Sequence, residues 1–407
     1  MKKKIRHLFF IIVVFISLSC FGQEEDFFYQ SPSIDSLDVN KIFLEIENLN
    51  FFKDNEFASE KISGYTLPGF RIIPKLSFSL DQNIHLEAGF SLLHFWGTNS
   101  YPCLSYTDIP VWKGDDYQKG FHLLPFFRAQ IELIENLNLV FGNLYINNNH
   151  NLILPLYNSE LNLSSDPEAG IQLLFNSKYF ISDLWFNWQS FIYKNDNHQE
   201  VFSFGYSTKT NILKPNSKFQ IYFPFQFVAQ HKGGEIDTLS ADLLQTWTNY
   251  AGGIGVNYKI DKLIDNISFD IYYAGFIQNI GSSIPFESGN GIYPKLSISS
   301  NNLNLSVAYW KSKDFVSIFG SPNFINLSLA TENMYFNEIS MIHSKLEYIY
   351  KKKKNYSLGF EVDCFYYFPF SGYRTGYGEI YSSDYAEFSF GLYLKLNPKF
   401  RLYSLKE

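Results

Sequence analysis

Cysteine and long apolar runs are both scarce in this sequence, and each scarcity excludes a class of protein. The 407 residues contain only three cysteines, Cys20, Cys103 and Cys364. If Cys20 lies in a cleaved leader, the two that remain are too few for a disulfide framework or a four-ligand metal site. After the N-terminus no run approaches the roughly 20 apolar residues that a membrane-spanning helix requires. The sequence therefore indicates neither a disulfide-stabilised scaffold nor a helical membrane protein.

Positive charge is also in short supply. Lysine and arginine total 33 against 40 aspartate and glutamate residues, which gives a formal net charge of -7. The longest basic run after the N-terminus is Lys351–Lys354, which is typical of a solvated turn. Because binding to phosphate backbones needs clustered lysine and arginine, we expect no nucleic-acid partner.

Aromatic residues are abundant, at 19% of the chain, with 42 phenylalanines and 29 tyrosines. The mean hydropathy is nevertheless only -0.13, so the chain as a whole is not apolar. A sheet that is apolar on one face and polar on the other satisfies both observations, because successive strand residues point to opposite faces.

The first residues have the pattern of a secretory signal peptide, residues 1–22. Positive charges lie within 2–6 and are followed by an apolar stretch at 8–18, which is too short to span a bilayer. Cleavage after Gly22 fits the small residues before it. The alternative is lipoprotein processing at Cys20, and either route exports the chain.

Strict alternation of apolar and polar residues recurs along the rest of the chain. Within 217–230 the phenylalanines and Ile221 fall on odd positions, whereas lysine and glutamine fall on even positions. Segments of about ten residues with this alternation are the signature of a transmembrane β-barrel. The same pattern occurs at 84–92, 123–133, 180–192, 358–366 and 386–396.

The connections between these segments alternate between short and long, as in outer-membrane barrels with periplasmic turns and extracellular loops. Seven short turns and two termini on one side require sixteen strands, and we allow fourteen to eighteen. Short turns are predicted near 81–83, 134–137, 176–179, 212–217, 260–265, 299–303 and 351–355. Longer loops are predicted near 52–66, 97–119, 146–166, 195–199, 232–245, 279–291, 312–337 and 372–383.

The predicted fold class is therefore all-β, a transmembrane antiparallel barrel over residues 41–407. Residues 23–40 are predicted to form a short periplasmic N-terminal segment. The last strand, near 385–396, is followed by Phe400 and Tyr403. This end resembles the aromatic signal read by the barrel assembly machinery, which we expect as a partner during biogenesis.

The register predicts a set of charged side chains that point into the lumen, where they would pair with one another or create a field across a water-filled pore. We single out as candidate lumen-lining residues Arg71, Lys75, Glu87, Arg128, Glu132, Asp183, Asp270, Lys345, Glu347, Glu361, Asp363 and Glu387. Glu45, Glu47 and Lys395 share this register.

Several loops suggest roles of their own. Either 97–119 or 146–166 would be the loop that narrows a pore, although an exposed cap is the simpler interpretation of each. The loop 312–337 is too apolar to lie bare in water. It folds into the lumen, meets the membrane interface, binds a partner, or hides a further hairpin. The tyrosines and glycines of 372–383 suit the aromatic girdle at a membrane surface or contact with sugars.

In pattern the mature chain resembles porin-like outer-membrane barrels of the Bacteroidota, and the Phe-Gly-Gln ending of the leader resembles signal peptides of that phylum. The resemblance implies passive diffusion of small hydrophilic solutes, by a chain that acts alone or as a homo-oligomer in outer-membrane lipid. One alternative is a plugged barrel that serves a surface complex as a binding or assembly component. The other is a conduit for hydrophobic molecules.

The sequence does not suggest an enzyme. Seven histidines follow the leader, at positions 85, 94, 122, 150, 198, 231 and 343, and none lies in a Gly-x-Ser-x-Gly or His-Glu-x-x-His motif. A pair of His85 with Asp183 across the barrel is conceivable, but no pattern supports it. We therefore expect no catalysis, cofactor or metal.

Overall fold

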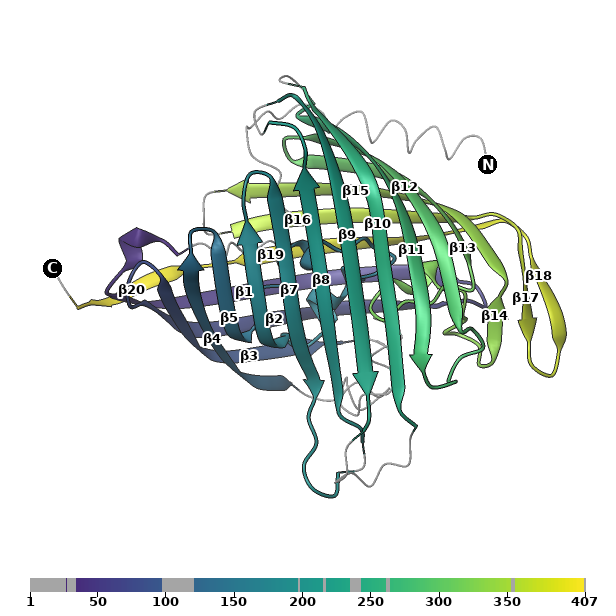
Figure 1. The fold of residues 1–407 in the computed structure, drawn as a ribbon, viewed down its shortest axis with the longest axis horizontal. Helices are drawn as coiled ribbons and strands as arrows, with labels where there is room; N and C mark the ends of the chain where they lie inside the picture. The colour runs from purple at the N-terminus through teal and green to yellow at the C-terminus, as the bar shows by residue number, and fades with distance from the viewer. Residues whose placement is uncertain are drawn as a thin grey trace.

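In the computed structural model, residues 27, 34–96, 121–196, 198–214, 217–234, 243–260, 264–352 and 356–405 are described. The predicted signal peptide lies outside these residues. Nearly all of the described chain is β-structure (Figure 1). Within it no helix combines the length and apolarity needed to cross a membrane.

One large antiparallel sheet contains most of the strands, and a small three-stranded sheet projects from one end of it. The large sheet consists of β1 (Lys41–Ala58), β2 (Ser63–Ser79), β3 (Ile84–Phe95), β4 (His122–Ile134), β5 (Leu137–Asn143), β6 (Ala169–Asn176), β7 (Phe180–Ser190), β8 (Val201–Asn211), β9 (Phe219–Lys232), β10 (Gln245–Lys259), β11 (Asn266–Ile280), β12 (Ser288–Ser300), β13 (Leu303–Lys313), β15 (Glu338–Lys352), β16 (Tyr356–Tyr367), β19 (Tyr385–Leu396) and β20 (Lys399–Ser404). The small sheet consists of β14 (Met334–Phe336), β17 (Phe370–Arg374) and β18 (Gly378–Ser382), and the short helices are η1 (Ser36–Asp38), η4 (Asn147–Asn151), α3 (Leu161–Ser164) and η5 (Pro322–Phe324).

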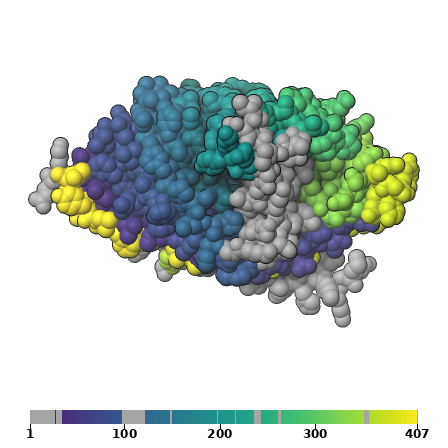
Figure 2. Space-filling view, turned by 90° about the horizontal axis from the view of Figure 1, so that it is seen from below, coloured from purple at the N-terminus to yellow at the C-terminus, as the bar shows by residue number. Residues whose placement is uncertain are grey.

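The large sheet closes because its first strand pairs with its last. On one side β1 pairs with β2, and on the other it pairs with β19 and then with β20. Since β19 and β20 follow one another along the same edge of β1, they count as one strand, and the described residues form sixteen strands. In the space-filling view, yellow C-terminal atoms lie beside purple N-terminal atoms (Figure 2). This confirms the predicted fold class, a closed antiparallel barrel.

The alternation seen in the sequence sorts side chains as predicted. Phe90 and Phe127 point outward and are 58% and 52% exposed, whereas Glu87 and Arg128 point inward and are 5% and 3% exposed. Exposed apolar residues of this kind occur on most strands of the barrel. The outer wall is therefore suited to lipid, which supplies no hydrogen-bond partners and so requires a sheet without open edges.

The short connections lie at one end of the barrel, here called the turn end, and all seven fall where they were predicted. Two of them are two-residue turns, in which Asn136 and Asn301 take the left-handed backbone with φ of 68° and 48°. Asparagine tolerates that conformation better than most residues. The longer connections lie at the opposite end, here called the loop end.

The first loop is much shorter than predicted. Instead of 52–66, only residues 59–62 connect β1 to β2. Lys53 and Asn55 suggested a loop, but both are inward-facing strand residues. The outward positions that follow them carry Asp54 and Glu56 rather than apolar side chains, and this obscured the alternation near the loop end.

Two loops fold back into the lumen. The first inner segment, residues 144–168, includes the fully buried Leu161, so the interpretation of this loop as an exposed cap is wrong. The second inner segment, residues 314–337, buries Phe315 and Phe324 completely. Of the four alternatives stated for the loop 312–337, folding into the lumen is therefore the one that the structure shows.

The two inner segments bind each other inside the barrel. The backbone N–H of Asn158 donates to the carbonyl of Phe319 at 2.7 Å, and that of Ser321 donates to Leu154 at 3.2 Å. Together with the inner wall the segments form a continuous apolar core. The middle of the lumen is thus filled by the chain itself.

The loop between β16 and β19 forms the β17–β18 hairpin, which extends beyond the barrel rim beside β14 (Figure 1). At its tip the Arg374 guanidinium lies 4.4 Å from the ring centre of Tyr377. The tyrosines predicted for a girdle or for sugar contact therefore lie mainly on this hairpin.

Candidate functional site

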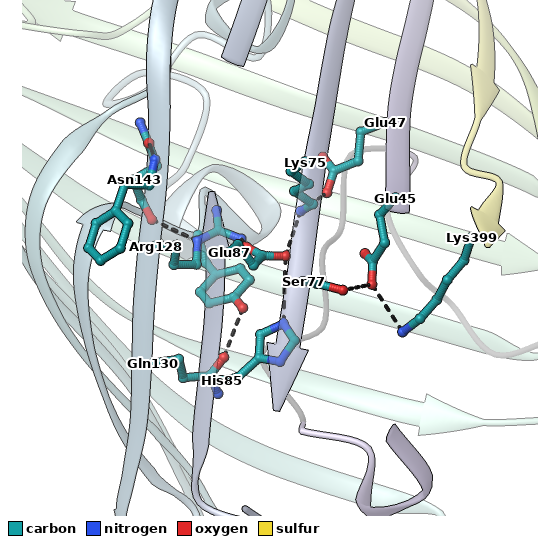
Figure 3. A network of polar contacts seen from close by, with 12 residues as sticks. Glu45, Glu47, Lys75, Ser77, His85, Glu87, Arg128, Gln130, Asn143 and Lys399 are labelled. Carbon is teal, nitrogen blue, oxygen red and sulfur yellow. Dashed lines mark hydrogen bonds and ion pairs between the residues drawn. The ribbon is translucent and has the colours of Figure 1, made fainter. Parts of the chain in front are cut away.

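Charged side chains of β1 to β4 form a network on the inner wall (Figure 3). Lys75 Nζ lies 2.5 Å from Glu47 Oε1 and 2.7 Å from Glu87 Oε1. Arg128 Nη1 lies 3.0 Å from Glu87 Oε2, and its Nε donates to the carbonyl of Asn143 at 2.7 Å. Five neighbouring strands, β1 to β5, are thereby joined by ion pairs and hydrogen bonds.

A second network lies where the barrel closes. Lys53 Nζ lies 2.5 Å from Glu361 Oε1 and 3.4 Å from Asp363 Oδ2. Lys345 Nζ approaches the other Glu361 oxygen at 2.9 Å, and His343 Nε2 lies 2.8 Å from Asp363 Oδ1. Strands β1, β15 and β16 are therefore linked through buried charges.

His150 anchors the first inner segment to the barrel wall. Its Nδ1 lies 2.7 Å from Asp183 Oδ2 on β7 and its Nε2 lies 3.2 Å from Glu168 Oε2. The ring stacks on Trp185 with centroids 3.9 Å apart. Burial by itself would lower the pKa of His150, but the two carboxylates raise it to about 10. The imidazole is therefore charged at neutral pH and acts as a clamp between two acids.

Lys61, between β1 and β2, holds the second inner segment. Its Nζ donates to the carbonyls of Pro322 and Ile325 at 2.5 and 2.6 Å. Burial lowers the pKa of Lys61 to about 7, while the more distant charge of Glu387 acts in the opposite direction. The lysine thus binds carbonyl oxygens without a carboxylate in contact.

Glu160 of the first inner segment faces β1 and β2. One of its oxygens accepts a hydrogen bond from Tyr65 at 2.6 Å and the other accepts one from Asn55 at 3.0 Å. Burial raises the pKa of Glu160 above its usual range, against the effects of Lys53 and of these two donors. The first inner segment is therefore bound to the barrel wall at both His150 and Glu160.

Below the inner segments, toward the turn end, the lumen retains a cavity of about 510 Å³. Its walls include Tyr222, Tyr272, Ser306 and Lys345, and residues of both inner segments close its upper side. The cavity is lined mainly by hydroxyl, amide and charged groups together with aromatic rings.

A further histidine–carboxylate pair lies at the loop end. His122, the first residue of β4, has its Nδ1 3.9 Å from Asp166 Oδ1, and both side chains remain partly exposed. Arg71 of β2 donates to the carbonyl of Ser165 beside them. Burial raises the pKa of Asp166, while His122 and Arg71 act to lower it.

Aromatic side chains cover the outer wall directly behind this pair. His94 lies 4.6 Å from Trp96 and 4.8 Å from Phe121 between ring centroids, and 6.1 Å from Phe70. Trp96 and Phe121 are exposed. An apolar surface suited to acyl chains thus adjoins a histidine, a carboxylate and a guanidinium.

The twelve residues predicted to line the lumen fall into separate groups rather than one site. Lys75, Glu87 and Arg128 meet in the network of Figure 3, and Lys345, Glu347, Glu361 and Asp363 meet at the closure. The other five have separate partners. Asp183 contacts His150, and Asp270 accepts a hydrogen bond from the Tyr222 hydroxyl. Glu387 and Glu132 accept from the backbone N–H groups of Ala58 and Asn136, and Arg71 donates to the carbonyl of Ser165.

Sequence reasoning missed Lys53, His150 and Glu160. Lys53 was assigned to a loop, and the other two lie in a segment without periodicity, so no pattern could place them. The conceivable pair of His85 with Asp183 does not form. His85 lies 2.9 Å from the Ser79 hydroxyl and 3.7 Å from the Glu87 carboxylate instead.

These features define a class, a transmembrane antiparallel β-barrel whose lumen is occupied by its own loops. The family model described as Lipid A 3'-O-deacylase-type matches residues 34–405. The chain therefore belongs to this family. Because the family is one of enzymes, the expectation that the chain is not an enzyme is wrong.

Solved structures similar to this chain are outer-membrane proteins. OccAB2 of Acinetobacter baumannii is 12% identical, with a TM-score of 0.49, covering 90% of this chain and 100% of that one. OprD of Pseudomonas aeruginosa is 9% identical, with a TM-score of 0.45, covering 89% and 94%. An anion-selective porin of Comamonas acidovorans is 9% identical, with a TM-score of 0.43, covering 88% and 98%. No curated protein matches the chain.

Proposed function

We propose that this barrel hydrolyses an acyl ester of a lipid A-type lipid in the leaflet around its loop end. The observation that carries the proposal is the pair of His122 and Asp166 at that end, behind an aromatic outer surface, in a chain of the Lipid A 3'-O-deacylase-type family. Long loops of outer-membrane barrels face the cell exterior. The loop end is therefore the end that meets outer-leaflet lipid.

The chemistry needs a base and a group that orients it. In the proposed reaction His122 takes a proton from water as the water oxygen bonds to the acyl carbonyl carbon. The ester C–O bond then breaks, the proton passes to the sugar oxygen, and a free fatty acid leaves. Asp166 stabilises the imidazolium formed in between.

The other histidine–carboxylate pairs are poorly placed for this substrate. Both ring nitrogens of His150 already contact carboxylates, and its side chain is fully buried. His343 lines the cavity on the turn-end side of the inner segments. His85, 3.7 Å from Glu87, lies near the start of β3 at the turn end. His122 lies at the loop end and keeps 17% of its side chain exposed.

Incubation with lipid A should test this proposal. The folded barrel in detergent or in lipid A-containing vesicles is expected to remove one acyl chain, detected by mass spectrometry. His122→Gln should slow release at least about a hundredfold, since general base catalysis contributes on that order. His198→Gln, in the loop between β7 and β8, should leave the rate unchanged. Full activity of a folded His122→Gln barrel would rule out His122, and no release by the wild-type barrel would rule out the activity.

Passage of small hydrophilic solutes is a second candidate, and the polar cavity of about 510 Å³ favours it. The inner segments lie across the route. If solutes pass, planar bilayers containing the barrel should show conductance steps, and Ser306→Trp at the turn-end side of the cavity should reduce them. A folded barrel without steps would reject a channel.

A further inference from the structure

The cavity between the inner segments and the turn end has the size of a ligand site. Its volume of about 510 Å³ lies within the range of roughly 300–1,000 Å³ that is usual for small-molecule pockets. Ile153 and Asn323 of the inner segments close one side. Toward the turn end, Lys209 and Ser306 line it and are partly exposed. A ligand would therefore enter from the turn end and stop against the inner segments.

The charges around the cavity balance one another. Four lysines and four acids line it, namely Lys53, Lys209, Lys295 and Lys345 with Glu160, Asp270, Glu347 and Asp363. Lys53 and Lys345 each contact two carboxylates, and Asp270 accepts from Tyr222. The Lys209 ammonium lies 3.8 Å from the ring centre of Tyr222. A charged ligand would compete with one of these contacts, whereas an uncharged polar ligand would not.

Uncharged polar groups and aromatic rings make up much of the remaining lining. Ser207 lines the cavity and is 1% exposed, and its hydroxyl has no hydrogen-bond partner within the described chain. A buried polar group of this kind normally finds a partner. The rings of Tyr222, Tyr272 and Tyr293 line the same space.

We propose that this cavity binds a neutral, polyhydroxylated small molecule, a monosaccharide or disaccharide, that enters from the turn end. Sugar hydroxyl groups would exchange hydrogen bonds with Ser207 and the neighbouring amides. The C–H face of the sugar would pack on the rings of Tyr272 and Tyr293, which offer apolar area beside a polar handle. The site is separate from the loop-end pair of His122 and Asp166, so it stands or falls independently of ester hydrolysis.

The test measures binding of matched sugars to the folded full-length barrel in LDAO, a detergent without a sugar headgroup, by saturation-transfer NMR. The probes are glucose and maltose, with glucosamine as the cationic and glucuronate as the anionic counterpart of glucose. Glucose or maltose should bind at least about fivefold more tightly than the charged sugars, because a charged sugar must displace an existing ion pair.

Two variants and a control locate the site. Ser207→Ala should weaken sugar binding about fivefold, the usual effect of losing one hydrogen bond between neutral groups. Ser306→Trp should abolish binding by filling the turn-end side. Ser203→Ala is the matched control, since Ser203 lies on the same strand and is also buried without a partner, but does not line the cavity. The Ser203→Ala barrel should bind glucose and maltose with the affinity of the wild type.

Three results would overturn the proposal. These are no saturation transfer to either neutral sugar, equal or tighter binding of glucosamine or glucuronate, and sugar binding that survives Ser306→Trp. Retention of the barrel fold in each variant is checked by its heat-dependent mobility in SDS gels, so loss of binding is not confused with unfolding.

Discussion

Replacing His150 by phenylalanine should destabilise the barrel by about 3–5 kcal/mol, the usual cost of removing one partner from a buried ion pair. Phenylalanine keeps a ring that can stack on Trp185, so the change removes the charge and its two hydrogen bonds but retains the stacked ring. Asp183 and Glu168 would then lie buried without the imidazolium that contacts both. Urea unfolding in LDAO, followed by tryptophan fluorescence, measures the free energy of unfolding.

The matched control is His198→Phe, which should change stability by less than about 0.5 kcal/mol, as is usual for surface positions. His198 Nε2 lies 3.2 Å from the carbonyl oxygen of Phe191 in an exposed setting. A cost below about 1 kcal/mol for His150→Phe would mean that the clamp does not hold the first inner segment.

The pH dependence of the same variant gives an independent check. The pKa of His150 is raised to about 10 from 6.5. Its stabilising effect is therefore complete below pH 6.5 and is lost as the pH rises through 10. Lys61 has the opposite sign, because its pKa is lowered to about 7 from 10.5. Its destabilising effect is complete below pH 7 and disappears as the pH rises through 10.5.

These two opposed effects should nearly cancel in the wild-type barrel between pH 7 and 10. As the pH rises from 7 to 10, the free energy of unfolding of the His150→Phe barrel should therefore increase. That of a Lys61→Met barrel should decrease over the same range. Parallel profiles for the wild type and both variants would contradict the assignment of these titrations.

The architecture could be predicted because a period of two and a closed sheet leave few alternatives. Once Phe90 faces lipid, Glu87 must face the lumen, and the turn positions then fix the number of strands. The prediction of strand boundaries failed where the outward-facing residues are polar rather than apolar. Asp54 and Glu56 lie near the loop end of β1, and without an apolar outer face the strand there looked like a loop.

The interior could not be predicted, because it depends on contacts between residues far apart in the sequence. Glu160 binds Asn55 and Tyr65, which precede it by 105 and 95 residues. The apolar composition of 312–337 indicated that this loop must be buried, but not what buries it. The loop-end pair of His122 and Asp166 joins a strand terminus to an inner segment, and no motif announces such a pair.

Replacing Lys53 by methionine is the second change expected to have a large effect, again about 3–5 kcal/mol. Methionine keeps most of the apolar stem but removes the ammonium from Glu361 and Asp363, while Lys345 still contacts Glu361 and His343 still contacts Asp363. The unfolding free energy in LDAO is again the measurement. Lys311→Met removes an exposed pair, with Nζ 3.6 Å from Glu338, and should cost at most about 1 kcal/mol.

The position of Lys53 explains why this pair matters for closure. On the first strand Lys53 lies opposite Gly391 of the last strand, and Gly391 in turn lies opposite Glu361 of β16. The ion pair therefore crosses over the last strand at a residue without a side chain. A Cβ added at Gly391 would come within 3.0 Å of Glu361 Cγ and 2.2 Å of the Tyr393 hydroxyl. Contact across β19 is thus available only with glycine at this position.

A double-mutant cycle separates this contact from general destabilisation. Glu361→Gln combined with Lys53→Met should cost less than the sum of the two single changes, by about 1–3 kcal/mol, because each single change leaves a buried charge that the double change removes. Additive costs would show that the two charges do not interact. The seam between the first and last strands would then be held by backbone hydrogen bonds and apolar packing alone.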